Sequence, residues 1–264
     1  MTWKHTVVAG SRIVELGFAL DDVMPRVSGV PPLVVATGVA HDDYRLDDGS
    51  SGCNETLLLG THMGTHIDGF AHVSRSGLVH GGLATASVQT RRGVAAFDMT
   101  SVAPIVAPGI LLDLPRQFGP GVLEEARAVR VEDLRHLESR DLAGAVIVLR
   151  TGWGRLWTDD PERYASLEER RPGFGADAAT WLAARGVRAV GTDSFSLEVC
   201  EPRSVVPPAM PVHLELLLDR GVFIFEALNL EELAGTGQDE FLFVALPLRI
   251  AGATGSPVRP IAIL

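Results

Sequence analysis

The segment from Ala145 to Val190 constrains the fold of this chain most strongly. Ala145 to Arg150 is a nearly continuous apolar run of strand length, which is typical of a strand covered on both faces. Asp177 to Arg185 has an apolar stripe at helical spacing, and Gly186 follows it as a helix stop. Val187 to Val190 is then a short strand. This strand–helix–strand order predicts the α/β class.

Composition narrows the possible classes of protein further. The chain has 264 residues, 46% of them hydrophobic, and no linker or internal repeat, so we expect residues 1–264 to form one globular domain. A net charge of −10 without a Lys/Arg cluster argues against nucleic-acid binding. Cys53 and Cys200 make no disulfide framework and indicate a reducing compartment. Met1 to Gly10 lacks a signal-peptide region and no apolar run is long enough to cross a membrane, so we expect a cytoplasmic protein without membrane partners.

Most other local patterns indicate strands. The strand candidates are 12–20, 33–39, 56–60, 93–100, 110–114, 222–225, 241–248 and 260–264. We expect 56–60 to be a buried strand that holds the following residues rigidly, and the acidic stretch 41–52 to be a loop. The prolines in 104–108 are expected to separate two strands. Helices are expected at 131–139 and 211–220.

Residues 61–72, Thr-His-Met-Gly-Thr-His-Ile-Asp-Gly-Phe-Ala-His, contain the densest functional pattern. His62, His66, Asp68 and His72 fall at even positions, so on an extended chain their side chains would share one face. Gly64, Thr65, Ile67 and Gly69 between them are poor helix formers, which predicts a strand that runs into a loop. Imidazole and carboxylate suit a divalent ion such as zinc or manganese, and a His beside the ligands can move protons. From the spacing alone, chance clustering or a hydrated surface is an equal alternative.

Three residues outside this stretch are candidates for the same site. His213 lies in the first turn of the predicted helix, where the backbone N–H dipoles keep the imidazole neutral and able to bind metal. Glu226 follows an apolar strand and is either a functional carboxylate or a surface charge. Trp153 follows the strand that ends at Arg150, and is either a pocket wall or a core residue. No Gly-x-Ser-x-Gly motif supports a serine nucleophile.

The motif His-x-Gly-Thr-His-x-Asp-x-x-x-His resembles the signature of the metal-dependent cyclase hydrolase family. That family includes bacterial kynurenine formamidases and isatin hydrolases. Further segments are similar to the family in order and spacing, from about residue 12 to the end of the chain. These segments are 149–153, 190–194, 211–213, 216–226 and 228–233.

The resemblance implies a swivelling β/β/α fold, with a mixed, barrel-like sheet flanked by helices, assembled as a homodimer or homotetramer. The residues implied as metal ligands are His62, His66, Asp68, His213 and Glu226. In dinuclear members the last two residues hold a second metal, with the Asp bridging, whereas other members bind a single manganese. His72 matches the catalytic acid/base.

The resemblance also implies a type of reaction. We expect a metal-dependent hydrolase that cleaves a linear or cyclic amide, a C–N bond other than a peptide bond, in a small-molecule substrate. Formamidase-like members often have Ala-Pro after the motif Asp, whereas this chain has Gly69-Phe70, so Phe70 is expected to shape the substrate pocket. Cyclisation or dehydration of a small carbonyl substrate at the same site, and a non-catalytic binding protein on this fold, remain alternatives. The sequence does not separate zinc from manganese, or one ion from two.

Overall fold

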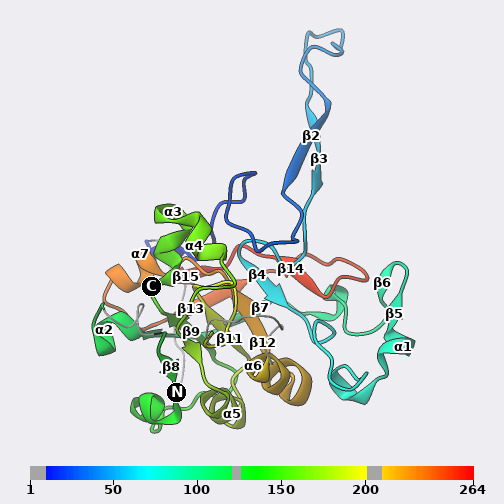
Figure 1. Cartoon of the computed structure of the whole chain (residues 1–264). Coiled ribbons are helices and arrows are strands. Elements are labelled where there is room, and N and C mark those ends of the chain that lie inside the picture. The colour runs from blue at the N-terminus through cyan, green and yellow to red at the C-terminus, as the bar shows by residue number, and fades with distance from the viewer. Residues whose placement is uncertain (1–9, 121–125, 201–209) are drawn as a thin grey trace.

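A mixed sheet forms the body of the molecule (Figure 1). The computed structural model describes residues 10–120, 126–200 and 210–264. Within them, the nine strands of this sheet lie in the order β1 (Ile13–Glu15), β15 (Ile261–Ile263), β13 (Glu240–Ala245), β7 (Ile105–Asp113), β9 (Val146–Arg150), β11 (Ala189–Thr192), β12 (Phe223–Glu226), β4 (His66–Asp68) and β14 (Gly255–Pro257). The four strands from β7 to β12 are parallel, and the other neighbours are antiparallel. The predicted α/β class is therefore confirmed.

Short helices and three small strand pairs surround the sheet. The helices are α1 (Thr85–Val88), α2 (Leu114–Phe118), α3 (Leu156–Asp159), α4 (Pro161–Ala165), α5 (Ala176–Ala184), α6 (Pro211–His213) and α7 (Glu231–Gly235). Helix α6 continues as a π-helical segment, Leu214–Arg220, which ends at Gly221, so the helix expected at 211–220 is present in two parts. Short 3-10 helices lie at His80–Gly82, Met99–Ser101, Val131–Leu137 and Trp153–Arg155. The small pairs are β2 (Val34–Val39) with β3 (Asn54–Leu58), β5 (Gln89–Thr90) with β6 (Gly93–Val94), and β8 (Ala128–Val129) with β10 (Gly173–Phe174).

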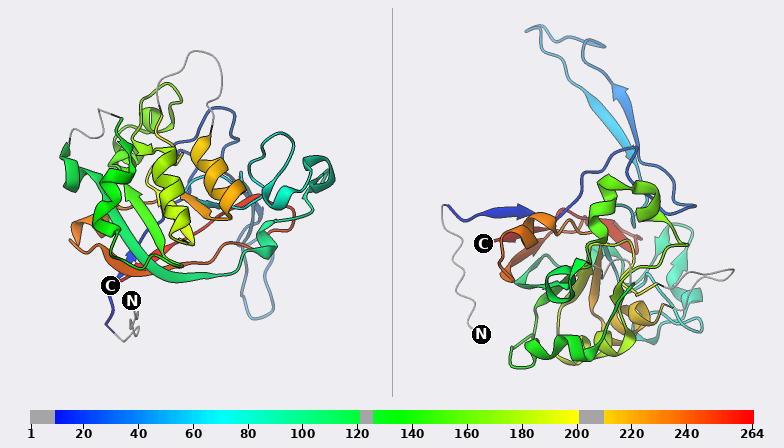
Figure 2. Two further views of the ribbon diagram at one scale, coloured as in Figure 1. Left: turned by 90° about the horizontal axis from the view of Figure 1, so that it is seen from below. Right: turned by 60° about the vertical axis from the view of Figure 1, so that its left-hand side comes forward.

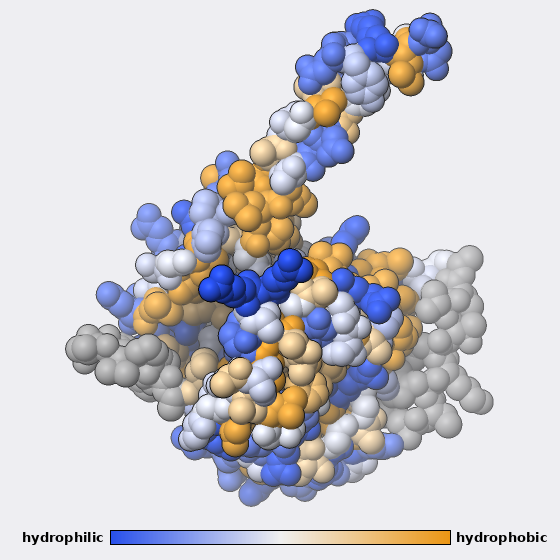
Figure 3. All heavy atoms as spheres, turned by 90° about the vertical axis from the view of Figure 1, so that its right-hand side faces the viewer, coloured by the Kyte–Doolittle hydropathy of each residue, from blue (hydrophilic) through white to orange (hydrophobic). Residues whose placement is uncertain are grey.

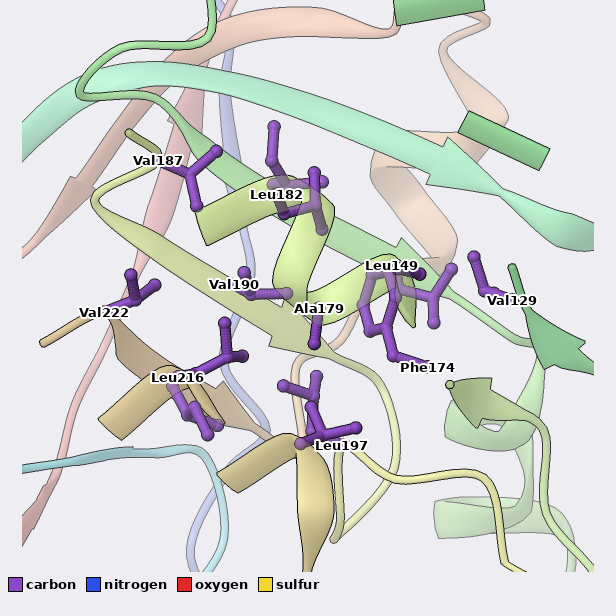
Figure 4. Close-up of a cluster of buried hydrophobic side chains, with 14 of the residues drawn as sticks. Val129, Leu149, Phe174, Ala179, Leu182, Val187, Val190, Leu197, Leu216 and Val222 are labelled. Carbon is purple, nitrogen blue, oxygen red and sulfur yellow. The ribbon is translucent and has the colours of Figure 1, made fainter. Parts of the chain in front are cut away.

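Apolar residues cover both faces of the central strands. On one face, Leu149 of β9 packs in a cluster with Leu182 of α5 and Leu216 of the π-helical segment (Figure 4). The alternate residue Val148 points to the opposite face, where it joins Phe243 of β13. Because the sheet curls, its own antiparallel strands close this second core. Burying one such side chain contributes about 1.5–3 kcal/mol, so the apolar run that ends at Arg150 stabilises the fold from both sides.

Pro108 lies inside β7, where a break between two strands was predicted. This prediction is wrong because β7 has two different neighbours. Pro108 pairs with Leu242 of β13, but the parallel pairing with β9 begins only at Gly109. One edge of β7 is therefore unpaired at Pro108, and a proline without an N–H group is tolerated there.

Strands β2 and β3 form a long hairpin that projects from the body, which we call the arm (residues 34–58) (Figures 1 and 2). The run 56–60 was predicted to be a buried strand, and this prediction is wrong. Leu57 and Leu58 are 61% and 64% exposed, and β3 is exposed along its whole length. Figure 3 shows hydrophobic and hydrophilic residues interspersed along the arm. The apolar pattern was read correctly as a strand, but among the described residues it pairs with β2 alone, which leaves its side chains exposed.

Within the described ranges, every helix is too short or too polar to span a membrane. The prediction that Met1 to Gly10 lacks a signal-peptide region concerns a segment of which residues 1–9 lie outside the described residues.

Candidate metal centre

The candidate centre is built where β4, β12 and α6 meet. Strand β4 is antiparallel to β12, and its register places His66 opposite Glu226. Asp68 lies two residues after His66 on the same strand, so both side chains project from the same face of the sheet. Helix α6 covers that face and brings in His213. All four residues are buried, which makes a surface role for Glu226 untenable.

The imidazoles of the centre converge on two carboxylates. His66 Nε2 lies 3.4 Å from Asp68 Oδ1 and 3.6 Å from Glu226 Oε2. His213 Nε2 lies 3.2 Å from Glu226 Oε1 and 3.6 Å from Asp68 Oδ2. His62 Nδ1 lies 2.6 Å from Asp68 Oδ1. Three ring nitrogens therefore face one pair of buried carboxylates, a set of donors that zinc and manganese both accept.

The outward ring nitrogens are each held by a different group. His66 Nδ1 donates to the Gly64 carbonyl at 2.8 Å, which leaves the Nε2 lone pair facing inward. His62 Nε2 lies 2.9 Å from the Thr254 hydroxyl. His213 Nδ1 lies 2.8 Å from Glu198 Oε1. Outer partners of this kind orient the imidazole ligands of metal sites.

Asp68 lies at the centre of the cluster and carries an unpartnered atom. Its side chain is fully buried, and among the described residues its Oδ2 has no hydrogen-bond donor. Burial raises the pKa of a carboxyl group, but the neighbouring imidazoles outweigh burial and hold the pKa of Asp68 well below its usual range. A buried carboxylate oxygen without a donor fits a site that takes a cation.

Buried carboxylates also shift the pKa values of the other ionisable groups in the centre. Burial lowers the pKa of His66, but the hydrogen bond and charge of Asp68 and the charge of Glu226 raise it to about 9. Burial also opposes the charging of His213, yet Glu198 and Glu226 raise the pKa of His213 well above its usual value. Burial raises the pKa of Glu226. The cluster therefore attracts positive charge, which a proton supplies in the absence of a metal.

His72 differs from the other imidazoles of the site. It stacks on His62, with the ring centroids 3.9 Å apart, and lines the same cavity. Burial and the positive charges of His62, His213 and His66 outweigh the attraction of Asp68 and lower the pKa of His72 to about 4. A neutral imidazole at neutral pH can accept a proton.

Ligand-atom distances divide the residues into two overlapping groups. Within the described ranges, the groups that could hold an ion are His62 with Asp68 and His72, and His66 with Asp68 and Glu226. Asp68 belongs to both groups, as a bridging residue would. The grouping differs from the one implied by the family resemblance, because His72 lies close enough to act as a ligand and His213 belongs to neither group.

Residues 61–72 form the short strand β4 with a turn on either side, and not one long strand. Only residues 66–68 are extended as β4, so the prediction of one polar strand face holds for His66 and Asp68 alone. Gly64 has a φ of 58° in the turn before β4, and a Cβ there would lie 2.3 Å from Leu20 Cδ2. Only glycine fits that turn without strain. The turns bring His62 and His72 back beside the strand.

A cavity of about 240 Å³ opens beside the imidazoles. Its aromatic walls are Trp157, Tyr164 and Phe195, and Phe18 stacks on Trp157 with 4.2 Å between ring centroids. Arg26 also lines the cavity. The cavity is small and largely apolar, with a few polar groups in its lining, as in sites for small molecules.

The two predicted substrate contacts lie outside the lining of this cavity. Phe70 stacks on Phe223, with 4.2 Å between ring centroids, and packs against the helix-side core. Trp153 is fully buried, and its indole N–H donates to the Tyr164 carbonyl at 3.1 Å. The core alternative for Trp153 is the one that the structure supports.

Several residues of the site carry no signal in a single sequence. Glu198 and Thr254 hold outer nitrogens from segments without a motif. Gly255 leaves the space that His62 occupies, since a Cβ at Gly255 would lie 2.4 Å from the imidazole. Trp157 lies four residues after Trp153, which was predicted as a pocket wall. The sequence offers no reason to prefer one of these two tryptophans for that role.

A family model described as "Putative cyclase" matches residues 14–199. The chain belongs to the putative cyclase family. This membership confirms the resemblance inferred from the 61–72 motif. It also places the two turns around β4 and the Glu198 segment inside the matched region.

Two relatives and one solved structure extend the comparison. The chain is 29% identical over 219 residues to a kynurenine formamidase of Salinibacter ruber, covering 82% of each protein. It is 25% identical over 213 residues to an isatin hydrolase of Roseibium aggregatum, covering 79% of this chain and 73% of the relative. A crystal structure of a novel cyclase superposes with a TM-score of 0.83 at 28% identity, covering 97% of this chain and 90% of the other. The predicted cyclase-family fold is confirmed.

Proposed function

We propose that this putative cyclase family member is a metal-dependent hydrolase that cleaves a linear or cyclic amide with water. The observation that carries the proposal is the convergence of three imidazole nitrogens on the buried carboxylates of Asp68 and Glu226, at one end of a cavity that His72 also lines. The relatives named kynurenine formamidase and isatin hydrolase agree with an enzyme acting on non-peptide C–N bonds.

The proposed ligands are the five residues of the centre. They are His62, His66, Asp68, His213 and Glu226. The donor set of nitrogen and oxygen atoms fits zinc or manganese, and the unpartnered Asp68 Oδ2 fits a cation between the imidazoles. We propose one or two ions per chain, the second held through Asp68. When bound, such an ion makes a water molecule more acidic and polarises a carbonyl group.

His72 is the proposed acid/base of the reaction. Its neutral imidazole accepts the proton of the attacking water and returns it to the leaving nitrogen, so that amide and water give a carboxylic acid and an amine. The hydrophobic walls around Trp157, Tyr164 and Phe195 exclude bulk water and favour a planar, apolar substituent on the amide. The substrate is proposed to be small, in keeping with the cavity of about 240 Å³.

A product assay tests this function. A panel of aryl formamides, anilides and cyclic amides is incubated with metal-free protein and with protein reconstituted with zinc or manganese. The masses of the products are then measured by mass spectrometry. We expect turnover only after reconstitution. A cyclic amide should give one product heavier than the substrate by one water, and a linear amide should give an acid and an amine whose masses add up to that of the substrate plus one water. A product of unchanged mass would point to cyclisation or rearrangement, and one lighter by a water to dehydration. Metal binding without turnover of any amide, ester or lactone would favour the binding protein.

Metal affinity should depend on pH through His66. Its pKa in the metal-free protein is about 9, so below that pH a bound proton must leave before the imidazole can bind an ion. We expect zinc affinity to rise by at least about tenfold per pH unit up to about pH 9, because the His66 proton contributes about tenfold and a proton on His213, whose pKa is also raised, adds to the slope. Chelator competition at several pH values measures this. An affinity that is flat between pH 7 and 9 would contradict the raised pKa of His66.

We also propose that the chain forms a single domain and assembles as a homodimer or homotetramer in the cytoplasm. The pairing of β1 with β15 joins the two ends of the described chain in one sheet, which supports one domain. Cys53 and Cys200 form no disulfide with each other, in keeping with a reducing compartment. The arm supports assembly, since a two-stranded hairpin is marginally stable by itself and exposes apolar side chains on both faces.

The arm gives a direct test of assembly. Light scattering coupled to gel filtration should give two or four times the 28.2 kDa of one chain. Leu57→Asp combined with Leu58→Asp places charges on both faces of the arm, because these neighbours on a strand point in opposite directions, and should shift the mass toward one chain. Leu167→Asp, an equally drastic change at an exposed leucine outside the arm, should keep the wild-type mass. A wild-type monomer would overturn the proposed assembly.

A further inference from the structure

Glu198 holds His213 from outside the proposed ligand set. It is buried and lies on the segment that follows β11. Its Oε1 accepts from the His213 backbone N–H at 3.0 Å and lies 2.8 Å from His213 Nδ1, while its Oε2 lies 2.7 Å from the same Nδ1. The Ser196 hydroxyl donates to Oε2 at 3.0 Å. The carboxylate is therefore fixed on one side by Ser196 and on the other by the imidazole.

This contact determines which nitrogen of His213 faces the site. An ionised carboxylate can only accept hydrogen bonds, so Nδ1 must carry the hydrogen. Nε2 is then the nitrogen that faces Glu226 Oε1 and Asp68 Oδ2, at 3.2 and 3.6 Å, and it can bind an ion once the proton that it holds in the metal-free protein has left. His66 is oriented by a backbone carbonyl and His62 by a hydroxyl. Within the described residues, His213 is the one of these three imidazoles whose outward nitrogen rests on a charged side chain.

The same segment also orients a second proposed ligand. The Leu197 backbone N–H donates to Glu226 Oε1 at 3.0 Å. Leu197 and Glu198 are neighbours, so a short stretch of chain sets the direction of both Glu226 and His213. A shift of this segment would move two proposed ligands together.

We propose that Glu198 is a positioning residue that aims His213 Nε2 into the metal site. This inference rests on the proposed function, because it assumes that His213 binds the ion. Glu198 acts through His213 and does not itself contact the ion. Outer carboxylates of this kind typically change metal affinity by about 10–100-fold when they are replaced.

A purely structural role makes a different prediction. Glu198 also accepts the backbone N–H of His213 in the first turn of α6, as a helix cap does. A cap alone would stabilise the helix without affecting metal affinity. Metal affinity and the stability of the metal-free protein therefore separate the two roles.

The test compares Glu198→Gln with the wild type and with Glu215→Gln, the same change two residues after His213, where Glu215 pairs with Arg220 at the surface. Zinc affinity is measured by chelator competition, the ligand geometry by the absorption spectrum of the cobalt-substituted protein, and the stability of the metal-free protein by thermal unfolding. For Glu198→Gln we expect zinc affinity about 10–100-fold weaker and an altered cobalt spectrum, with a melting temperature close to that of the wild type. Glu215→Gln should match the wild type in all three.

A double variant tests whether Glu198 changes zinc affinity through His213. In a His213→Ala background, Glu198→Gln should cause no further loss of zinc affinity, because the residue through which it acts is gone. If Glu198→Gln does not fold, Ser196→Ala serves instead, since it removes the hydroxyl that donates to Glu198 Oε2 and should weaken zinc binding to a smaller degree. The inference is overturned if the variant that folds binds zinc as tightly as the wild type. It is also overturned if Glu198→Gln weakens zinc binding to the same degree in the His213→Ala background. A wild type that binds no zinc would overturn the proposed function itself.

Discussion

His72→Ala should retain its metal and lose about 10²–10⁴-fold in turnover number. The imidazole of His72 is neutral at neutral pH, with a pKa of about 4, and it lines the cavity beside His62. Removing it takes away the group that carries the proton from water to the leaving nitrogen, while the proposed ligands stay in place. Steady-state kinetics on any amide found by the panel, together with the metal content of the same preparation, measures both properties.

The distances around His72 make this variant decisive. His72 is also close enough to His62 and Asp68 to be a ligand itself. Loss of metal from His72→Ala would therefore assign it to the ligand set, and undiminished activity would remove its acid/base role. His136→Ala, which alters an exposed imidazole far from the site, should behave as the wild type and controls for effects of the substitution on folding.

Asp68→Asn should abolish stable metal binding and, with it, activity. The side chain keeps its shape, but it loses the negative charge that His62, His66 and His213 surround. Because Asp68 takes part in both groups of candidate ligands, we expect zinc affinity to fall by more than the roughly 100-fold that marks the upper range for outer-shell changes. Chelator competition and elemental analysis measure the loss.

A matched substitution controls for the change of charge. Asp219→Asn removes one carboxylate from a surface pair with Arg75 and should leave metal content unchanged. If Asp68→Asn still held a full complement of metal, Asp68 would not be the bridging residue, and the ion would have to lie elsewhere in the cluster.

The α/β class could be predicted from local sequence, and the same kind of pattern predicts where the candidate site lies. The apolar run that ends at Arg150 has the composition of a strand buried on both faces, and it is one. His66 and Asp68 are two residues apart, so any extended chain places them together. Both predictions depend on short-range periodicity, which one sequence contains.

The other residues of the candidate site, the exposure of the arm and the choice of pocket wall depend on long-range packing, which cannot be predicted from one sequence. His62 and His72 meet through turns on either side of β4, and Glu198 reaches His213 across fifteen positions of chain. The run 56–60 has the same apolar character as a core strand, yet residues 56–58 lie in the exposed arm, where β2 is the one strand of the described ranges that pairs with them. Trp153 and Trp157 are both plausible pocket walls by composition, and only the packing of the 3-10 turn at Trp153–Arg155 decides between them.

The most direct test of the central claim is the metal content of protein purified without added metal, measured by elemental mass spectrometry on the wild type and His66→Ala. We expect about one or two zinc or manganese ions per wild-type chain and their loss from the variant, since His66 Nε2 faces both Asp68 and Glu226. No metal in the wild type, even after reconstitution, would contradict a metal centre at residues 62–72. The non-catalytic binding protein would then be the better description.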